Sequence, residues 1–118
     1  MNPRVIPTGV HGTLDYLASG VNLALPWLLG LNDAPWAVIV PRIDGVAGAS
    51  YSLLTDYELG VFKVLPMPVH PTFDAAKGVF TASSPWLFGF AKKGIRYWLP
   101  HVLMGTADVL AAITSKTD

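Results

Sequence analysis

The sequence predicts an all-α fold, a four-helix transmembrane bundle built from two tandem two-helix repeats related by a pseudo-twofold axis. Three observations predict it. Charged residues make up only 14% of the 118 residues, against roughly 25% in an ordinary soluble domain. Four apolar stretches of helical length follow one another along the chain. A gap-free alignment relates the first half of the chain to the second.

The internal alignment is obtained by shifting the sequence by 59 positions, half of its 118 residues. Self-similarity over a fixed period is the signature of a duplicated structural unit. It predicts repeats at 1–59 and 60–118 that together form one domain. The twelve identical pairs are Val5/Val64, Pro7/Pro66, Val10/Val69, His11/His70, Thr13/Thr72, Asp15/Asp74, Pro26/Pro85, Trp27/Trp86, Leu28/Leu87, Gly30/Gly89, Pro41/Pro100 and Thr55/Thr114.

The apolar stretches predict helices at about 12–31, 36–54, 72–91 and 97–114. Each has 18 to 20 residues, which suits a hydrocarbon core about 30 Å thick at about 1.5 Å per residue. The connectors within each repeat are short and favour antiparallel hairpins, while the longer link at 55–68 is charged and is expected outside the membrane. Four spans place both termini on one side, and the distribution of Lys and Arg favours the cytoplasmic side.

Proline and tryptophan mark the first helix of each repeat near its end. Pro26 and Pro85 remove a backbone hydrogen bond there, which membrane helices tolerate when neighbours satisfy the freed carbonyl. Trp27 and Trp86 follow these prolines and are expected in helix packing or in an aromatic belt at the membrane interface.

The residues around the second of these prolines resemble a known family. Ser84-Pro85-Trp86, followed by Leu87-Phe88-Gly89-Phe90, resembles the SPW repeat of small bacterial membrane proteins, whose motif lies in the first of two transmembrane helices. The first half carries Leu25-Pro26-Trp27, so its serine is replaced. The stretches Val10–Tyr16 and Tyr51–Gly60 are also similar to such proteins. The resemblance implies a multi-pass protein of the bacterial inner membrane, and it implies no activity.

Ionisable residues inside the apolar stretches form a first polar layer near the terminal side. His11 and Asp15 are four residues apart, as are His70 and Asp74, so each pair shares a helix face. Intramembrane ionisable groups are costly and are candidates for function. One interpretation is structural hydrogen bonding. The alternatives are haem held by His11 and His70, a divalent metal bound by these histidines, and a proton or solute relay. In the metal alternative, Asp15 and Asp74 either bind the ion themselves or accept a hydrogen bond from a histidine ligand.

A second polar layer is expected toward the hairpin side and contains Arg42, Asp44 and His101. These residues are predicted to serve helix packing or an interface, with Arg42 extending to the membrane surface or pairing with Asp44. Lys77 is expected to extend likewise or to pair with Asp74, three residues earlier on the same face.

The sequence offers no catalytic constellation, so we expect a protein that is not an enzyme. The formal net charge is zero with no basic stripe, which argues against nucleic-acid binding, and no cysteine is present. The first hypothesis is a scaffold or accessory subunit that packs against membrane lipid, further copies of itself or a larger membrane complex. The second is a haem- or metal-binding membrane protein. The third is a small transporter or channel formed by an oligomer.

Overall fold

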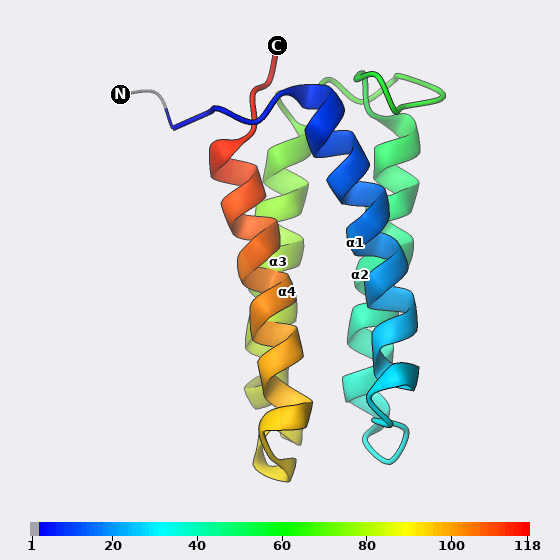
Figure 1. Cartoon of the computed structure of the whole chain (residues 1–118), viewed down its shortest axis with the longest axis vertical. Coiled ribbons are helices and arrows are strands. Elements are labelled where there is room, and N and C mark those ends of the chain that lie inside the picture. The colour runs from blue at the N-terminus through cyan, green and yellow to red at the C-terminus, as the bar shows by residue number, and fades with distance from the viewer. Residues whose placement is uncertain (1–2) are drawn as a thin grey trace.

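A computed structural model describes residues 3–118 and shows four α-helices and one short 3-10 helix (Figure 1). Within these residues the only β-type pairings are isolated bridges. The predicted all-α fold with four helices is therefore confirmed. The elements are α1 (Thr8–Leu28), α2 (Pro35–Leu54), α3 (His70–Leu87), η1 (Phe90–Lys93) and α4 (Ile95–Thr114).

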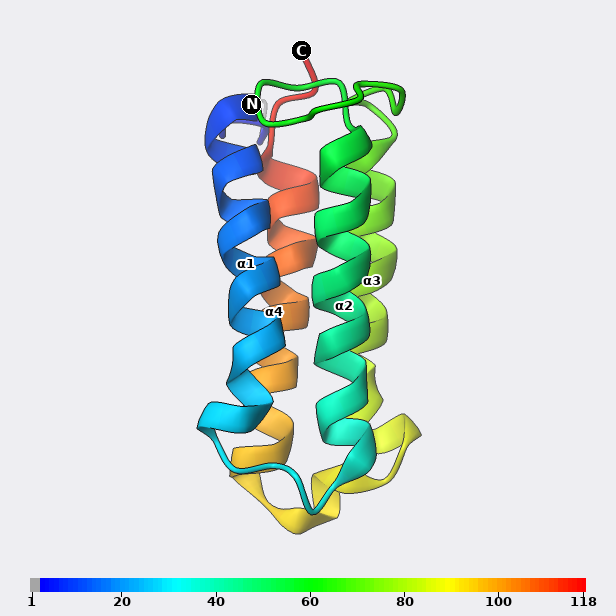
Figure 2. The same cartoon turned by 90° about the vertical axis from the view of Figure 1, so that its right-hand side faces the viewer.

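The helices form two antiparallel hairpins that stand side by side. The most extensive packing joins α1 to α2 and α3 to α4, and smaller contacts of α2 with α3 and of α1 with α4 close the ring. The helices α1 and α3 are thus diagonal across the bundle. Figure 2 shows the connector between α2 and α3 at the same end as the C-terminus, with both hairpin turns at the other end. We call these the terminal end and the hairpin end.

The first helix of each hairpin ends earlier than the hydropathy predicts. The helix α1 ends at Leu28 and α3 at Leu87, where the apolar stretches run on to 31 and 91. Gly30 has a φ of 66° and Gly89 a φ of 76°, and a left-handed glycine commonly ends a helix. These two glycines are an aligned pair of the internal repeat.

Small residues allow close approach of the helices. A Cβ at Gly105 would lie 2.3 Å from the carbonyl oxygen of Gly78, and a Cβ at Gly45 would lie 2.8 Å from that of Ser19. Any larger side chain at these positions forces the helices apart, because such contacts are far below van der Waals distance. The α3–α4 and α1–α2 pairs therefore depend on glycine.

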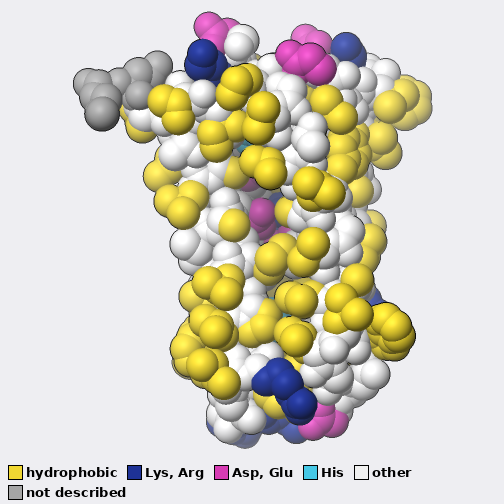
Figure 3. Space-filling view, in the orientation of Figure 1, with side chains coloured by type: hydrophobic (Ala, Val, Ile, Leu, Met, Phe, Trp, Pro, Cys, Tyr) yellow, Lys and Arg dark blue, Asp and Glu magenta, His cyan; other side chains and the backbone are white. Residues whose placement is uncertain are grey.

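The bundle buries many polar residues and exposes many large apolar ones, although a small apolar core of Leu31, Ala34, Ala37, Phe90 and Tyr97 is also buried. Large apolar side chains are exposed along all four helices, and Figure 3 shows them over the middle of one face, with charged groups mainly at the two ends. The buried polar and charged residues are His11, Ser19, Asn22, Asp44, Ser52, Thr55, His70, Asp74, Thr81, Ser84, His101, Asp108 and Ser115.

By length and apolarity together, none of the helices within residues 3–118 meets the criterion for a membrane-crossing segment.

Candidate metal centre

Two diagonal helices bring the first polar layer together near the terminal end. His11 and Asp15 occupy successive turns of α1, and His70 and Asp74 do the same on α3. Each pair lies on the face that its helix turns to the core, because residues four apart are neighbours on a helix surface. The four side chains therefore meet across the bundle axis, and we refer to them as the centre.

The centre is defined by four short contacts between imidazole nitrogens and carboxylate oxygens. Nε2 of His11 lies 3.1 Å from Oδ1 of Asp15 and 2.8 Å from Oδ2 of Asp74. Nε2 of His70 lies 2.9 Å from Oδ2 of Asp15 and 3.2 Å from Oδ2 of Asp74. Each nitrogen thus faces a carboxylate from its own helix and one from the opposite helix.

Burial of the centre is nearly complete. The side chains of His11 and His70 are 0% exposed, that of Asp74 is 3% exposed and that of Asp15 is 13% exposed. Carboxylates removed from water in this way are costly unless they are paired with cations or bound to a metal. The arrangement needs positive charge between its members, either as protons on the imidazoles or as a bound ion.

Residues of α2 and the connector orient the centre from outside. The hydroxyl of Tyr51 donates to Oδ1 of Asp74, and that of Tyr57 donates to Oδ2 of Asp15 at 2.9 Å. Thr55 Oγ1 donates to the carbonyl of Tyr51 at 2.7 Å and lies 2.7 Å from Nδ1 of His70. Because the threonine has only one hydroxyl proton, Nδ1 of His70 donates to it. Partners of this kind fix the orientation and tautomer of metal-binding histidines.

The proton on Nδ1 leaves Nε2 of His70 as the free ligand position of that ring. This Nε2 is buried and has no hydrogen bond of good geometry among the described residues. Two carboxylate groups face it, so without a cation it must itself carry a proton. With a cation at the centre, its lone pair becomes a ligand.

Haem does not fit between the two histidines. The imidazole ring centroids are 4.9 Å apart with the planes at 84°, and both Nε2 atoms already reach Oδ2 of Asp74. Axial ligation needs a flat macrocycle between the two nitrogens. The rings stand in direct contact instead, so the haem alternative has no room at the position that the sequence predicted for it.

A single metal ion fits the same atoms. One ligand atom from each of the four residues can be chosen so that all lie within 4.8 Å of one another. A tetrahedral ion with bonds of about 2.0–2.1 Å holds its ligands about 3.3 Å apart, close to the nitrogen–oxygen spacings of 2.8 to 3.2 Å. Two imidazoles and two carboxylates form a donor set suited to divalent first-row ions such as Zn²⁺ or Fe²⁺.

The second polar layer is organised around Lys77, contrary to the sequence prediction. Its Nζ lies 2.7 Å from Oδ1 of Asp44 and 2.8 Å from Oδ2 of Asp108, so it pairs with α2 and α4 rather than with Asp74. Thr81 also donates to Oδ2 of Asp44 at 2.6 Å. Asp44 therefore pairs with Lys77, and not with Arg42 as the sequence predicted.

The remaining predicted site residues divide between the core and the surface. His101 is buried and its Nε2 donates to the carbonyl of Ala37 at 2.9 Å, which binds α4 to α2. Pro26 and Pro85 are fully buried, while Trp27 and Trp86 are exposed near the hairpin end. Arg42 is exposed on α2.

Sequence reasoning missed the three residues that orient the centre, Tyr51, Thr55 and Tyr57. All three fall in Tyr51–Gly60, a stretch noted only for its resemblance to other proteins. Tyr51 and Thr55 are four residues apart, but the helix α2 ends at Leu54, and Tyr57 lies in the connector beyond it. The resemblance of this stretch to other proteins was the one signal available in the sequence, but it did not indicate which residues would contact the first polar layer.

Together these features define a helical bundle with a polar interior and a buried centre of two histidines and two aspartates. A family model described as the SPW repeat domain matches residues 9–115, so the chain belongs to the SPW repeat family, as its Ser84-Pro85-Trp86 motif predicted. No curated protein and no solved structure matches the chain. Membership supports the coarse class, a small membrane protein, and assigns no activity.

Proposed function

We propose that this chain is an integral membrane protein that binds one divalent transition-metal ion at the centre formed by His11, Asp15, His70 and Asp74. The inverted distribution of side chains supports the membrane part of the proposal. The carboxylates of Asp44, Asp74 and Asp108 point into the bundle, while many large apolar side chains are exposed along all four helices. A lipid environment favours this distribution and water opposes it.

The observation that carries the metal proposal is the meeting of two imidazoles and two carboxylates from diagonal helices in a buried volume. Nothing in the sequence requires both pairs to converge on the same point, yet all four nitrogen–oxygen contacts fall between 2.8 and 3.2 Å. The hydrogen bond from His70 to Thr55 and those from the two tyrosines supply the outer partners that metal ligands usually have.

The ligand set favours a structural or sensing role over catalysis. Four protein ligands complete a tetrahedral coordination sphere, whereas catalytic sites keep one position open for water or substrate. Bound metal would link α1 to α3 across the bundle, and hence one half of the chain to the other. Metal binding would therefore stabilise the folded bundle, by an amount that grows with free metal concentration.

Metal analysis of the purified protein tests the proposal. We expect about one Zn²⁺ or Fe²⁺ per chain after purification in mild detergent and gentle washing. The double variant His11→Ala/His70→Ala should contain none. His101→Ala is the matched control, since His101 is buried but lies outside the centre, and it should retain the metal. Metal-free wild-type protein that takes up no ion in a titration would overturn the proposal.

Membrane integration and topology are tested separately. We propose the bacterial inner membrane, with both termini on the cytoplasmic side. In that case the protein stays in the membrane fraction after an alkaline carbonate wash. Reporters fused to either end should also be active only as cytoplasmic fusions. Release by the wash would refute integration, and activity of periplasmic reporters would refute the orientation.

A second candidate function, an accessory subunit, is favoured by an apolar groove on the outer face of α2. The groove has a volume of about 460 Å³ and is lined by Val38, Ile39, Arg42, Ile43, Val46 and Ala47. A single cation within an apolar groove suits either another helix that carries an acid or a lipid headgroup. Native mass spectrometry from detergent distinguishes a homo-oligomer, a foreign subunit and a monomer, and a lipid-free monomer argues against this candidate.

A further inference from the structure

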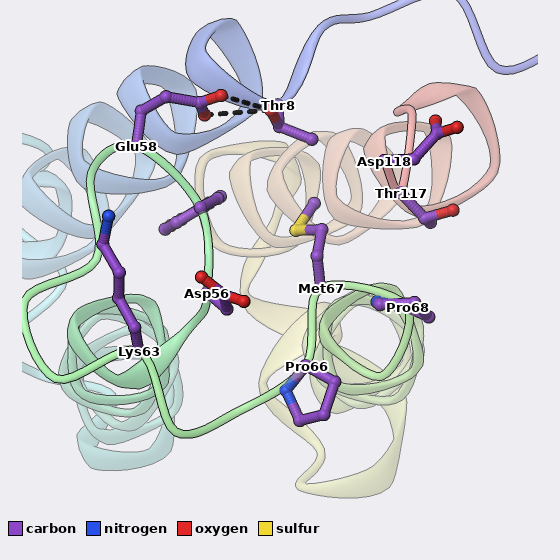
Figure 4. A pocket seen from close by; sticks show the side chains of 10 residues that line it. Thr8, Asp56, Glu58, Lys63, Pro66, Met67, Pro68, Thr117 and Asp118 are labelled. Carbon is purple, nitrogen blue, oxygen red and sulfur yellow. Dashed lines mark hydrogen bonds between the residues drawn. The ribbon is translucent and has the colours of Figure 1, made fainter.

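The connector between α2 and α3 forms one wall of a cavity at the terminal end, directly above the centre. The cavity has a volume of about 440 Å³ and carries three carboxylates and one ammonium group, from Asp56, Glu58, Asp118 and Lys63 (Figure 4). The acidic excess attracts cations by simple electrostatics. The pKa of Glu58 is held below its usual value by a hydrogen bond from its own backbone and one from the Thr8 hydroxyl.

One residue lining this cavity also contacts the centre. Tyr57 lines the cavity, is only 5% exposed, and donates its hydroxyl proton to Oδ2 of Asp15 at 2.9 Å. Its ring centroid lies 5.3 Å from that of His70 and 6.4 Å from that of His11. The phenol ring is thus a partition between the cavity and the centre. Asp15, the carboxylate that it caps, is also the most exposed member of the centre.

Close packing of the connector against α1 holds Tyr57 in this position. A Cβ at Gly12 would lie 3.2 Å from Cε2 of Tyr57 and 2.9 Å from Cβ of Leu59. Only glycine lets the connector approach α1 this closely. The hydroxyl of Tyr16 also donates to the carbonyl of Leu59 at 2.9 Å, which pins the same turn of the connector.

The opposite approach to the centre is unfavourable for a cation. An ion entering from the hairpin end would have to pass the layer of Lys77, whose ammonium group already binds Asp44 and Asp108. Passage would require these buried ion pairs to break, which is costly in a low-dielectric interior. At the terminal end, Lys63 is the one cationic side chain among the described residues that line the cavity.

We propose that metal ions enter and leave the centre through this acidic cavity, and that Tyr57 is the gate between the two. The proposal rests on the proposed function, because it needs a metal at the centre. Opening requires the Tyr57 hydroxyl to leave Asp15 and the ring to turn toward the cavity. Both loading and release then pass through the same barrier, so a change to the gate alters both rates together.

Exchange kinetics test the gate. The wild-type protein in detergent is loaded with Co²⁺, whose visible absorption reports occupancy, and release is followed after addition of excess EDTA. Loading is measured by mixing metal-free protein with Co²⁺. In Tyr57→Phe the hydrogen bond to a carboxylate is lost while the ring remains, so we expect both rates to rise at least about tenfold, with occupancy near one ion per chain.

The matched control is Tyr97→Phe. Tyr97 is also buried, and its hydroxyl also donates to a carboxylate, Asp33, at 2.8 Å, but at the hairpin end. Its exchange rates should equal those of the wild type. Asp56→Asn with Glu58→Gln should slow loading several-fold at low ionic strength, and the difference should vanish in high salt.

The outcomes separate the gate from the metal proposal. Faster loading and release in Tyr57→Phe alone support the gate. Unchanged rates overturn it while leaving the metal centre intact, and so does faster release with unchanged loading, which would make Tyr57 a support of the bound state only. Wild-type protein that shows no Co²⁺ absorption at all overturns the proposed function, and the gate with it.

Discussion

Metal binding at the centre should release two protons per ion. Asp15 and Asp74 place two negative charges in the buried centre beside Nε2 of His11 and of His70, and in the absence of metal these charges need two compensating positive charges. Two imidazolium ions then balance Asp15 and Asp74, and the buried centre is neutral. A divalent ion also neutralises the two carboxylates, so it replaces both protons without changing the net charge.

The magnitude follows from this proton count. Release of two protons changes the logarithm of the apparent binding constant by two per pH unit, which is about 2.7 kcal/mol per pH unit. Binding should therefore tighten about 100-fold between about pH 5 and about pH 6, where ordinary imidazoles are protonated and carboxylates are not. The sign is fixed, since protons compete with metal for the same nitrogens.

Isothermal titration calorimetry of metal-free protein with Zn²⁺ measures the number of protons released per ion directly. Titrations in several buffers of different ionisation enthalpy give the protons released as the slope of apparent enthalpy against buffer enthalpy. Asp15→Asn is the informative variant, because one carboxylate no longer requires a balancing imidazolium, and its slope should fall to about one. A wild-type slope near zero would refute the ion pairs at the centre, and a slope of one would refute the second imidazolium ion.

Three further outcomes follow from other parts of the bundle. Gly105→Ala should lower the unfolding temperature in detergent, because its Cβ would lie 2.3 Å from a carbonyl oxygen of α3. A Cβ at Gly20 has no atom within 4 Å, so the control Gly20→Ala should raise the free energy of unfolding by up to about 1 kcal/mol. Equal unfolding temperatures for the two variants would contradict the close approach of α3 and α4. Lys77→Met should destabilise by about 3–5 kcal/mol, since two buried carboxylates lose their cation, and an unchanged denaturation midpoint would exclude that ion-pair cluster. Tyr97→Phe should raise the pKa of Asp33, which the Tyr97 hydroxyl lowers most, and carboxyl NMR titration that finds no rise would refute that hydrogen bond.

Much of the fold could be predicted from sequence because it depends on short-range patterns. Apolar stretches of helical length and short connectors were enough for four helices in the right order. The helix ends were less predictable, because hydropathy does not register the left-handed conformation of Gly30 and Gly89. These glycines end the helices although apolar residues continue beyond them.

The centre was predictable only in part. The spacing of His11 with Asp15 and of His70 with Asp74 placed each pair on one face, and the repeat suggested equal depth. Convergence of both pairs on one point depends on the bundle geometry, which places α1 and α3 on a diagonal. The partners of Lys77 were unpredictable for the same reason. Helical spacing pointed to Asp74 on the same helix, but the carboxylates that Lys77 binds lie on α2 and α4.

X-ray absorption spectroscopy of the purified, metal-loaded protein tests the central claim most directly. We predict a first shell of two imidazole nitrogens and two carboxylate oxygens at about 2.0–2.1 Å around Zn²⁺, with imidazole scattering lost in His11→Ala/His70→Ala and kept in His101→Ala. A shell of oxygen atoms alone, unchanged by the double variant, would contradict the metal centre.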